Sequence, residues 1–221
     1  PAFLLSQPVR NSTDTHLAAL LEDRSLPGGT DAAFETLFGI WGIRYSRGGD
    51  TACQQASQQG LRCWFQKGSL NHLKRLNRPA ILGLIDQQGN HYQVVLTSLE
   101  EDSVELTIAN RQFSITLDDL SRYWYGDHLL LWQPGPWAEQ ILTPGMEDDS
   151  VRWLRETLAS IQDTPAFDPE SEFYDERLAA RVRDYQRTRR LAVDGIVGTQ
   201  TQIVMNTDLA IPGTPLLTEH R

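Results

Sequence analysis

The chain has 221 residues, of which 40% are hydrophobic, and its formal net charge is −9. The length favours two modest domains over one, and the negative charge argues against a nucleic-acid backbone as a partner. The sequence has no apolar run of roughly 18 residues and no cationic, apolar leader, so neither a membrane span nor a signal peptide is predicted. Because it begins at Pro1 without a methionine, we expect an excised segment of a longer protein.

The first two-thirds of the chain has the pattern of one α/β domain. Amphipathic spacing predicts helices over residues 14–23, 31–41, 50–59 and 70–76. Alternating apolar residues predict strands over 80–85, 91–98, 103–108, 112–116 and 128–132. A short helix is predicted over 117–123, before the last of these strands. Helices followed by an antiparallel sheet predict the α+β class for a domain that covers 1–133.

The chain contains two cysteines, Cys53 and Cys63. Gly60 ends the helix predicted over 50–59, and a strand begins at Leu61. A helix that turns back into an adjacent strand can bring its start within disulfide distance of that strand. We therefore expect a disulfide, which would contribute about 2–3 kcal/mol in the chain-entropy model, with two free thiols as the alternative. No metal site is expected, because no C-x-x-C pair or nearby histidine pair is present.

The last third of the chain carries three sequence elements of a small helical domain. A Pro- and Gly-marked stretch over 134–145 predicts a linker, and apolar residues at helical spacing follow over 151–161. A basic helix then ends in Asp184-Tyr185-Gln186-Arg187, and a two-glycine turn, Asp194-Gly195-Ile196-Val197-Gly198, leads into Thr199-Gln200-Thr201. These elements resemble the three-helix peptidoglycan-binding domain, whose pattern closes with F/Y-Q and D-G-x-x-G-x-x-T. We assign 146–221 to such a domain and its C-terminal tail.

This resemblance suggests which side chains would contact the cell wall. The expected peptidoglycan-binding residues are Tyr185, Asp194, Gly195, Thr199, Gln200, Thr201, Arg152 and Arg181. Hydroxyls and amides suit glycan and stem-peptide groups, and the arginines, with Arg155 beside them, suit stem-peptide carboxylates. A structural alternative stays open, in which Asp194 and Gly195 only form the turn and Tyr185 fills the core.

Several stretches of the first domain share a second family pattern. Residues 32–42 have the pattern of a nucleophile helix, 60–61, 69–73 and 79–82 match the middle of the family, and 89–95 match its histidine-bearing strand. A short helix, an aromatic-glycine pair and an apolar strand recur over 117–131. The domain thus resembles the papain-like cysteine peptidases that process double-glycine leaders of bacteriocins, and the resemblance implies a papain-like fold.

The catalytic residues of that family are not all matched. Such an enzyme needs a thiolate at the start of the nucleophile helix, activated by an imidazole that a third side chain orients. The likeness places Gly29 or Thr30 at the nucleophile position, His91 at the histidine position and Asn110 near the orienting position. We interpret His91 and Asn110 as vestigial and the domain as a degenerate peptidase, with no catalytic residue, no cofactor and no metal.

A peptidase-like domain followed by a peptidoglycan-binding domain resembles the periplasmic region of the general secretion pathway protein A family, the ExeA-type component of type II secretion. The resemblance implies a non-catalytic periplasmic module of a protein anchored in the inner membrane, with an ATPase domain outside this chain. It implies peptidoglycan and general secretion pathway protein B as partners, and assembly or transport of the secretin, an indirect partner, through the cell wall.

Two other functions stay open from the sequence. The first is a cell-wall-targeted cysteine peptidase or hydrolase whose nucleophile lies elsewhere, and the second is a purely structural domain that docks partners. Self-association stays open from the sequence, and assembly around a secretin ring would be compatible with it. Contact of this segment with nucleic acid or with a membrane is not expected.

Overall fold

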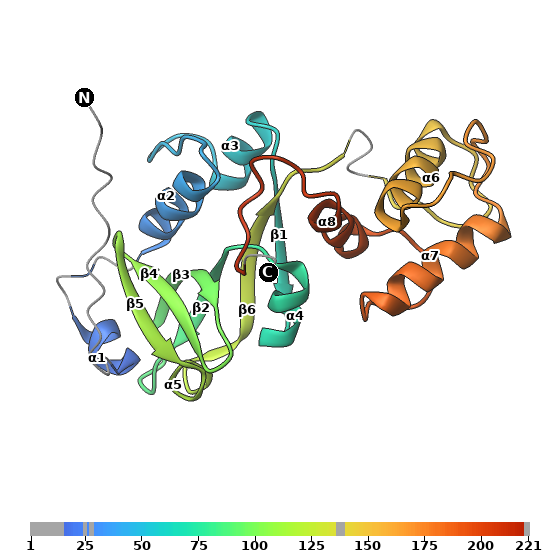
Figure 1. The fold of residues 1–221 in the computed structure, drawn as a ribbon. Coiled ribbons are helices and arrows are strands. Elements are labelled where there is room, and N and C mark those ends of the chain that lie inside the picture. The colour runs from blue at the N-terminus through green and yellow to red at the C-terminus, as the bar shows by residue number, and fades with distance from the viewer. Residues whose placement is uncertain (1–15, 24–25, 27–28, 136–139, 219–221) are drawn as a thin grey trace, which may run out of the picture.

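The computed structural model describes residues 16–23, 26, 29–135 and 140–218. Within these residues, six strands form one antiparallel sheet in the order β1-β6-β2-β3-β4-β5, and eight helices pack around it or beside it (Figure 1). The α+β prediction is confirmed. Because β6 lies between β1 and β2, the last strand of the domain joins its first strand to the rest of the sheet.

The elements lie close to the ranges expected from the sequence. The strands are β1 Arg62–Lys67, β2 Ala80–Ile85, β3 His91–Leu99, β4 Ser103–Ile108, β5 Arg111–Thr116 and β6 Trp124–Trp132. The helices are α1 Leu17–Glu22, α2 Thr30–Ile40, α3 Ala52–Gln58, α4 Leu70–Leu76, α5 Leu117–Ser121, α6 Asp149–Gln162, α7 Glu176–Thr188 and α8 Thr199–Asp208.

The largest difference concerns β6, which begins at Trp124 rather than at residue 128. Gly126 allows this early start because its φ is +99°, and the Gly126 carbonyl accepts a hydrogen bond from the Gly68 amide at 3.0 Å. A Cβ at residue 126 would lie 2.5 Å from the Gly68 carbonyl oxygen. Glycine therefore permits a close backbone approach that extends the strand.

Helices α2 and α3 cover part of one face of the sheet. Their apolar side chains form a cluster with Ile81, Val95, Leu129 and Leu131 from three neighbouring strands. The expected disulfide is present: Cys53 of α3 and Cys63 of β1 are bonded, with their Cα atoms 5.5 Å apart. This bond fixes α3 to the outermost strand.

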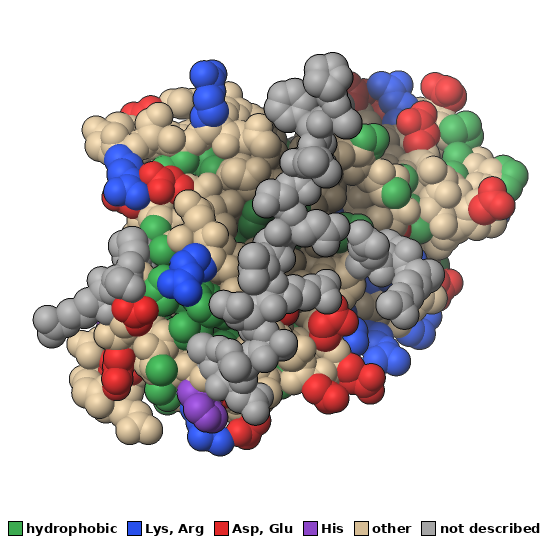
Figure 2. All heavy atoms as spheres, turned by 60° about the vertical axis from the view of Figure 1, so that its left-hand side comes forward, with side chains coloured by type: hydrophobic (Ala, Val, Ile, Leu, Met, Phe, Trp, Pro, Cys, Tyr) green, Lys and Arg blue, Asp and Glu red, His purple; other side chains and the backbone are tan. Residues whose placement is uncertain are grey.

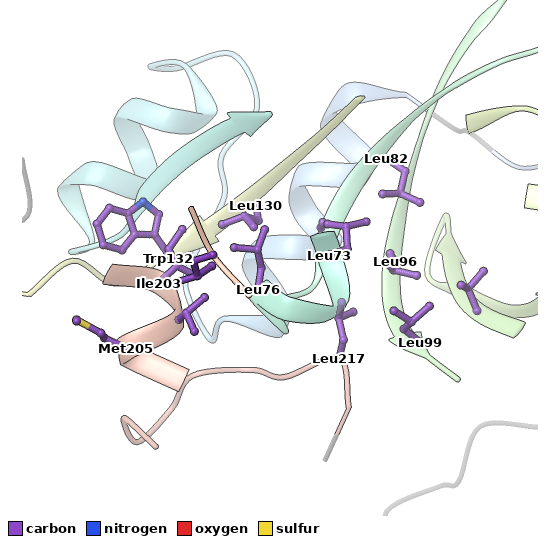
Figure 3. Packing of buried hydrophobic residues seen from close by; sticks show 14 of the residues in the cluster. Leu73, Leu76, Leu82, Leu96, Leu99, Leu130, Trp132, Ile203, Met205 and Leu217 are labelled. Atoms are coloured by element: carbon purple, nitrogen blue, oxygen red, sulfur yellow. The ribbon is translucent and has the colours of Figure 1, made fainter. Parts of the chain in front are cut away.

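The opposite face of the sheet is buried under helices from both halves of the chain. Leu73 and Leu76 of α4 and Leu130 and Trp132 of β6 share one continuous hydrophobic cluster with Ile203, Val204 and Met205 of α8 and with Leu217 (Figure 3). Figure 1 shows α8 between the sheet and the pair α6 and α7. The two halves of the chain therefore share a packed seam.

Polar contacts cross the same seam. The Arg78 guanidinium, which is 1% exposed, donates to Thr207 Oγ1 at 2.9 Å and to the Ile203 carbonyl oxygen at 3.4 Å. Asn206 Nδ2 donates to the Gln133 carbonyl oxygen at 2.6 Å. These bonds satisfy buried polar groups that would otherwise oppose the packing of α8 on α4.

The segment after α8 returns to the first domain. Asn77 closes α4 in the left-handed conformation, with φ of +51°. Its side-chain amide donates to the Thr218 carbonyl oxygen at 3.1 Å and accepts from the Thr218 amide at 2.9 Å. The tail from 211 to 218 thus links the helical domain to the end of α4 through hydrogen bonds.

The surface charges of both signs lie close together on part of the molecule. Figure 2 shows one face on which acidic and basic side chains are interspersed. Ion pairs such as Arg47–Glu35 and Lys67–Asp127 are largely exposed, and such pairs contribute only about 0–1 kcal/mol each. Stability therefore comes mainly from the buried clusters. Over the described ranges, no helix combines the length and the apolar character needed to cross a membrane.

Candidate functional site

The turn between α7 and α8 is built around one buried glutamine. Gln186, which is 1% exposed, donates from Nε2 to Asp194 Oδ1 and to the Ile196 carbonyl oxygen, both at 2.9 Å. Its Oε1 accepts from the Gly195 amide at 2.9 Å and from the Asp194 amide at 3.2 Å. Both polar groups of the side chain are therefore hydrogen-bonded within the turn. The F/Y-Q element of the sequence pattern carries this role, which sequence reasoning did not assign.

Asp194 and Gly195 also serve the turn itself. Asp194 Oδ1 accepts from the Ile196 amide at 2.8 Å, as in an Asx turn. Gly195 has φ of +76°, and its carbonyl oxygen accepts from the Tyr174 hydroxyl at 2.8 Å. These contacts support the structural alternative for both residues.

Tyr185 and Thr201 lie inside the domain. Tyr185 is 2% exposed, and its hydroxyl donates to Asp208 Oδ2 at 2.7 Å. Burial, together with this carboxylate, raises the pKa of the Tyr185 hydroxyl. Thr201 is 5% exposed. In this arrangement neither side chain is open to a ligand on the surface.

Thr199 and Gln200 are half-buried in the first turn of α8. Gly198 is the N-cap of this helix, and the cap makes no side-chain hydrogen bond. Thr199 therefore begins the helix and does not cap it. With the exposed Asp194, these two side chains are the accessible part of the expected site at the turn.

The expected arginines do not converge on the turn. Arg152 pairs with Asp149 at the start of α6, whereas Arg181 donates to Gln162 Oε1 at the end of the same helix. At 1.5 Å per residue, the two ends are about 20 Å apart. Arg155 is buried and donates to the carbonyl oxygens of residues 167, 171 and 173 and to Asp175. It therefore organises the loop before α7.

The second candidate centre is the peptidase-like fold. Thr30 begins α2, Gly29 is its N-cap, and both are exposed. His91 is the exposed first residue of β3. Asn110 lies in the two-residue turn between β4 and β5, and its Oδ1 accepts from Thr36 Oγ1 of α2 at 3.4 Å. The fold thus places Asn110 beside the helix that matches the nucleophile helix.

Asn110 also has a backbone role. The φ angles of Ala109 and Asn110 are +49° and +62°. A two-residue hairpin with positive φ at both positions matches the right-handed twist of its strands, and asparagine tolerates that conformation well. Because both cysteines of the chain form the disulfide, neither supplies a thiol to this centre.

Comparison with known families identifies both halves of the chain. Residues 26–134 match the family model "GspA, peptidase C39-like domain", and residues 147–205 match the "Putative peptidoglycan binding domain". The peptidase-like match covers the sheet with α2 to α5, and the second match covers α6 to α8 up to residue 205.

Two curated relatives align with both halves of the chain. General secretion pathway protein A of Aeromonas hydrophila is 29% identical over 80% of this chain and 32% of its own length. The "Putative general secretion pathway protein A" of Escherichia coli (strain K12) is 30% identical over 77% of this chain and 34% of its own length. The chain thus spans about a third of these curated relatives.

A solved structure has the same arrangement. The crystal structure of a periplasmic domain of the EpsAB fusion protein of the Vibrio vulnificus type II secretion system is 25% identical. It aligns with a TM-score of 0.55 over 84% of this chain and 82% of that one. The chain therefore combines a GspA peptidase C39-like domain with a peptidoglycan-binding domain and is homologous to general secretion pathway protein A.

Proposed function

We propose that this chain is a non-catalytic, periplasmic module of a type II secretion assembly protein that is anchored in the inner membrane. It binds peptidoglycan through the helical domain and a protein partner, general secretion pathway protein B, through other surfaces. In this way it helps the secretin to pass through the cell wall or to assemble in it. An ATPase domain belongs to the part of the protein outside this chain. The observation that carries the proposal is the peptidoglycan-binding match joined to a peptidase-like match.

The cysteine arrangement favours a binding role over a cysteine peptidase. An acyl-transfer enzyme of this type needs a free thiolate next to an imidazole. Cys53 and Cys63 are bonded to each other, and the helix start holds Thr30. A disulfide also suits an oxidising compartment such as the periplasm.

The wall surface that we propose is the accessible part of the expected site, namely Thr199 and Gln200 with the exposed Asp194 beside them. Arg152 of α6 and Arg181 of α7, which contacts the last residue of α6, remain candidate contacts. Tyr185, Gly195 and Thr201 would act indirectly by holding this surface in shape.

Co-sedimentation of the intact chain with purified peptidoglycan sacculi tests the proposal. The double variant Thr199→Ala, Gln200→Ala should bind roughly tenfold more weakly at unchanged melting temperature, because a few residues of an interface carry most of its affinity. The matched control changes Gln112 and Ser114, two exposed residues of β5, to alanine and should bind like the wild type. If the intact chain stays in the supernatant, the wall-binding proposal is wrong and the alternative of a purely structural, partner-docking domain is favoured.

The hydrolase alternative is tested separately. Incubation with double-glycine leader peptides or with sacculi should give no cleavage products. Cleavage that disappears in Thr30→Ala, while the protein stays folded, would support an enzyme with a hydroxyl nucleophile and overturn the non-catalytic assignment.

A further inference from the structure

Part of the sheet face that carries α2 and α3 is left uncovered. Along β6, Leu129 and Leu131 are buried, whereas Tyr125 and Asp127 on the same face are exposed. The other strands behave alike: on β1 the exposure increases from Cys63 to Phe65. The helices therefore cover one end of this face and leave its other end open.

The open end contains a hollow of about 440 Å³ that crosses β1, β6, β2 and β3. Its walls include Phe65 and Lys67 of β1, Asp127 and Leu129 of β6, and Gln93 of β3. Phe65 is 65% exposed. An exposed aromatic side chain at the rim of a hollow lined by both polar and apolar side chains can anchor a bound partner.

Gly83 keeps the floor of the hollow open. It lies in the middle of β2, between Leu82 and Leu84, which point into the core on the opposite side. A Cβ at residue 83 would meet the Asp127 Cβ at 3.6 Å, an ordinary van der Waals distance. The fold therefore tolerates a side chain here, and glycine in a strand interior often marks the close approach of a ligand or a second backbone.

The polar groups of the hollow indicate what would fill it. Gln93 Oε1 is buried and accepts no hydrogen bond from the described residues, so a donor such as a peptide N–H would remove the cost of that orphan acceptor. Lys67 and Asp127 pair with each other at 3.3 Å, so the rim has no net charge to attract an ion. This charge balance favours an uncharged ligand with apolar side chains.

The strand edge beside the hollow points to the same ligand. β1 is one of the two edge strands of the sheet, and among the described residues its one strand partner is β6. Its last three residues, Phe65 to Lys67, are exposed. A free edge offers unpaired main-chain groups to another extended chain.

We propose that this hollow, between the edge of β1 and the floor at Gly83, is a docking groove for an uncharged, extended polypeptide segment of a partner protein. An apolar side chain of that segment packs against Phe65 and Leu129 above Gly83, and a main-chain N–H donates to Gln93 Oε1. The inference rests on the partner-binding half of the proposed function. The groove is on the peptidase-like domain, away from the wall surface at Thr199.

The test measures fluorescence anisotropy of labelled, overlapping peptides that span the periplasmic part of general secretion pathway protein B, with the intact chain as receptor. We expect at least one peptide to bind, and Phe65→Ala and Gly83→Leu each to weaken it roughly tenfold or more. Phe173→Ala removes another phenylalanine that is 48% exposed, on the helical domain, and should not change binding. Circular dichroism shows whether each variant is folded.

Two outcomes overturn the groove: no peptide binds, or binding survives both Phe65→Ala and Gly83→Leu. Phe65→Ala keeps the test valid if Gly83→Leu fails to fold, because the Phe65 side chain is exposed. Sedimentation with sacculi in parallel separates the two proposals. Groove variants should keep wall binding, whereas a groove variant that loses sacculi but keeps the peptide would identify the ligand as glycan.

Discussion

Arg78 should hold the two halves of the chain together, and Arg78→Met tests this directly. Methionine keeps much of the aliphatic volume and removes the guanidinium. In the wild type the guanidinium donates to the carbonyl oxygens of Leu76 and Asn77 in the last turn of α4, and to Thr207 and Ile203 of α8. Removing it leaves buried acceptors on both sides of the seam without this donor.

Two effects oppose each other at this position. Burial lowers the pKa of Arg78 to about 10, which means that the buried charge costs free energy that methionine would relieve. Each orphaned buried acceptor costs about 1–3 kcal/mol. Because several acceptors lose their donor at once, we expect the second effect to prevail and the free energy of unfolding to fall by about 2 kcal/mol. The charge is present in both folded and unfolded states near neutral pH, so this loss should not depend on pH there.

Calorimetry measures the result. A loss of about 2 kcal/mol lowers the melting temperature of a chain of this size by about 4–8 °C. The control Lys74→Met changes an exposed cation on the same helix and should have an effect within about 0.5 kcal/mol. An Arg78→Met protein that melts at or above the wild-type temperature would refute the reasoning, because it would show that the buried charge destabilises the seam.

Three further predictions concern single sites. Reduction of the Cys53–Cys63 bond should expose two thiols per chain and lower the free energy of unfolding by about 2–3 kcal/mol, seen as a lower urea midpoint. Thiols that titrate in the unreduced, unfolded protein would contradict the pairing. Burial lowers the pKa of both His72 and His128, so the fold holds the two side chains neutral. The free energy of unfolding should therefore fall as the pH drops below about 6.5, where the unfolded chain takes up protons. Urea unfolding across a pH series measures this, and a free energy of unfolding that rises on acidification would exclude it. Gln186→Leu should lower the free energy of unfolding by about 2–4 kcal/mol, because the amides of the turn lose their acceptor. Arg187→Leu, at an exposed position, should change the urea midpoint little. Equal effects of the two variants would contradict the special role of Gln186.

Most elements could be predicted from the sequence because their signals are local. The period-two strands and the amphipathic α6 need only the spacing of apolar residues, and the disulfide needs only a helix that returns into a strand. The early start of β6 could not be predicted, since it depends on the Gly126 backbone approaching Gly68, which is distant in sequence. The buried Arg78 was also hidden, because an arginine after a helix normally indicates a solvated end.

The packing of the two halves limits how the helical domain can be studied. Asn206 and Thr207 of α8 bond to Gln133 and Arg78 of the first domain, and the tail at Thr218 bonds to Asn77. A fragment that starts at residue 146 would expose the apolar face of α8 to water. Loss of wall binding in such a fragment would therefore report unfolding as readily as a missing ligand contact, and variants of the intact chain are the sharper tool.

The residues that define the peptidoglycan-binding pattern are mostly those that fold it. Gln186 and Gly195 direct their polar groups inward, and Asp194 gives one carboxylate oxygen to the turn. A match to such a pattern therefore identifies the fold more securely than the ligand, because selection for the turn alone would preserve it. The wall contacts that we propose would come from side chains that the turn does not use. Thr199 and Gln200, the half-buried first residues of α8, meet that condition.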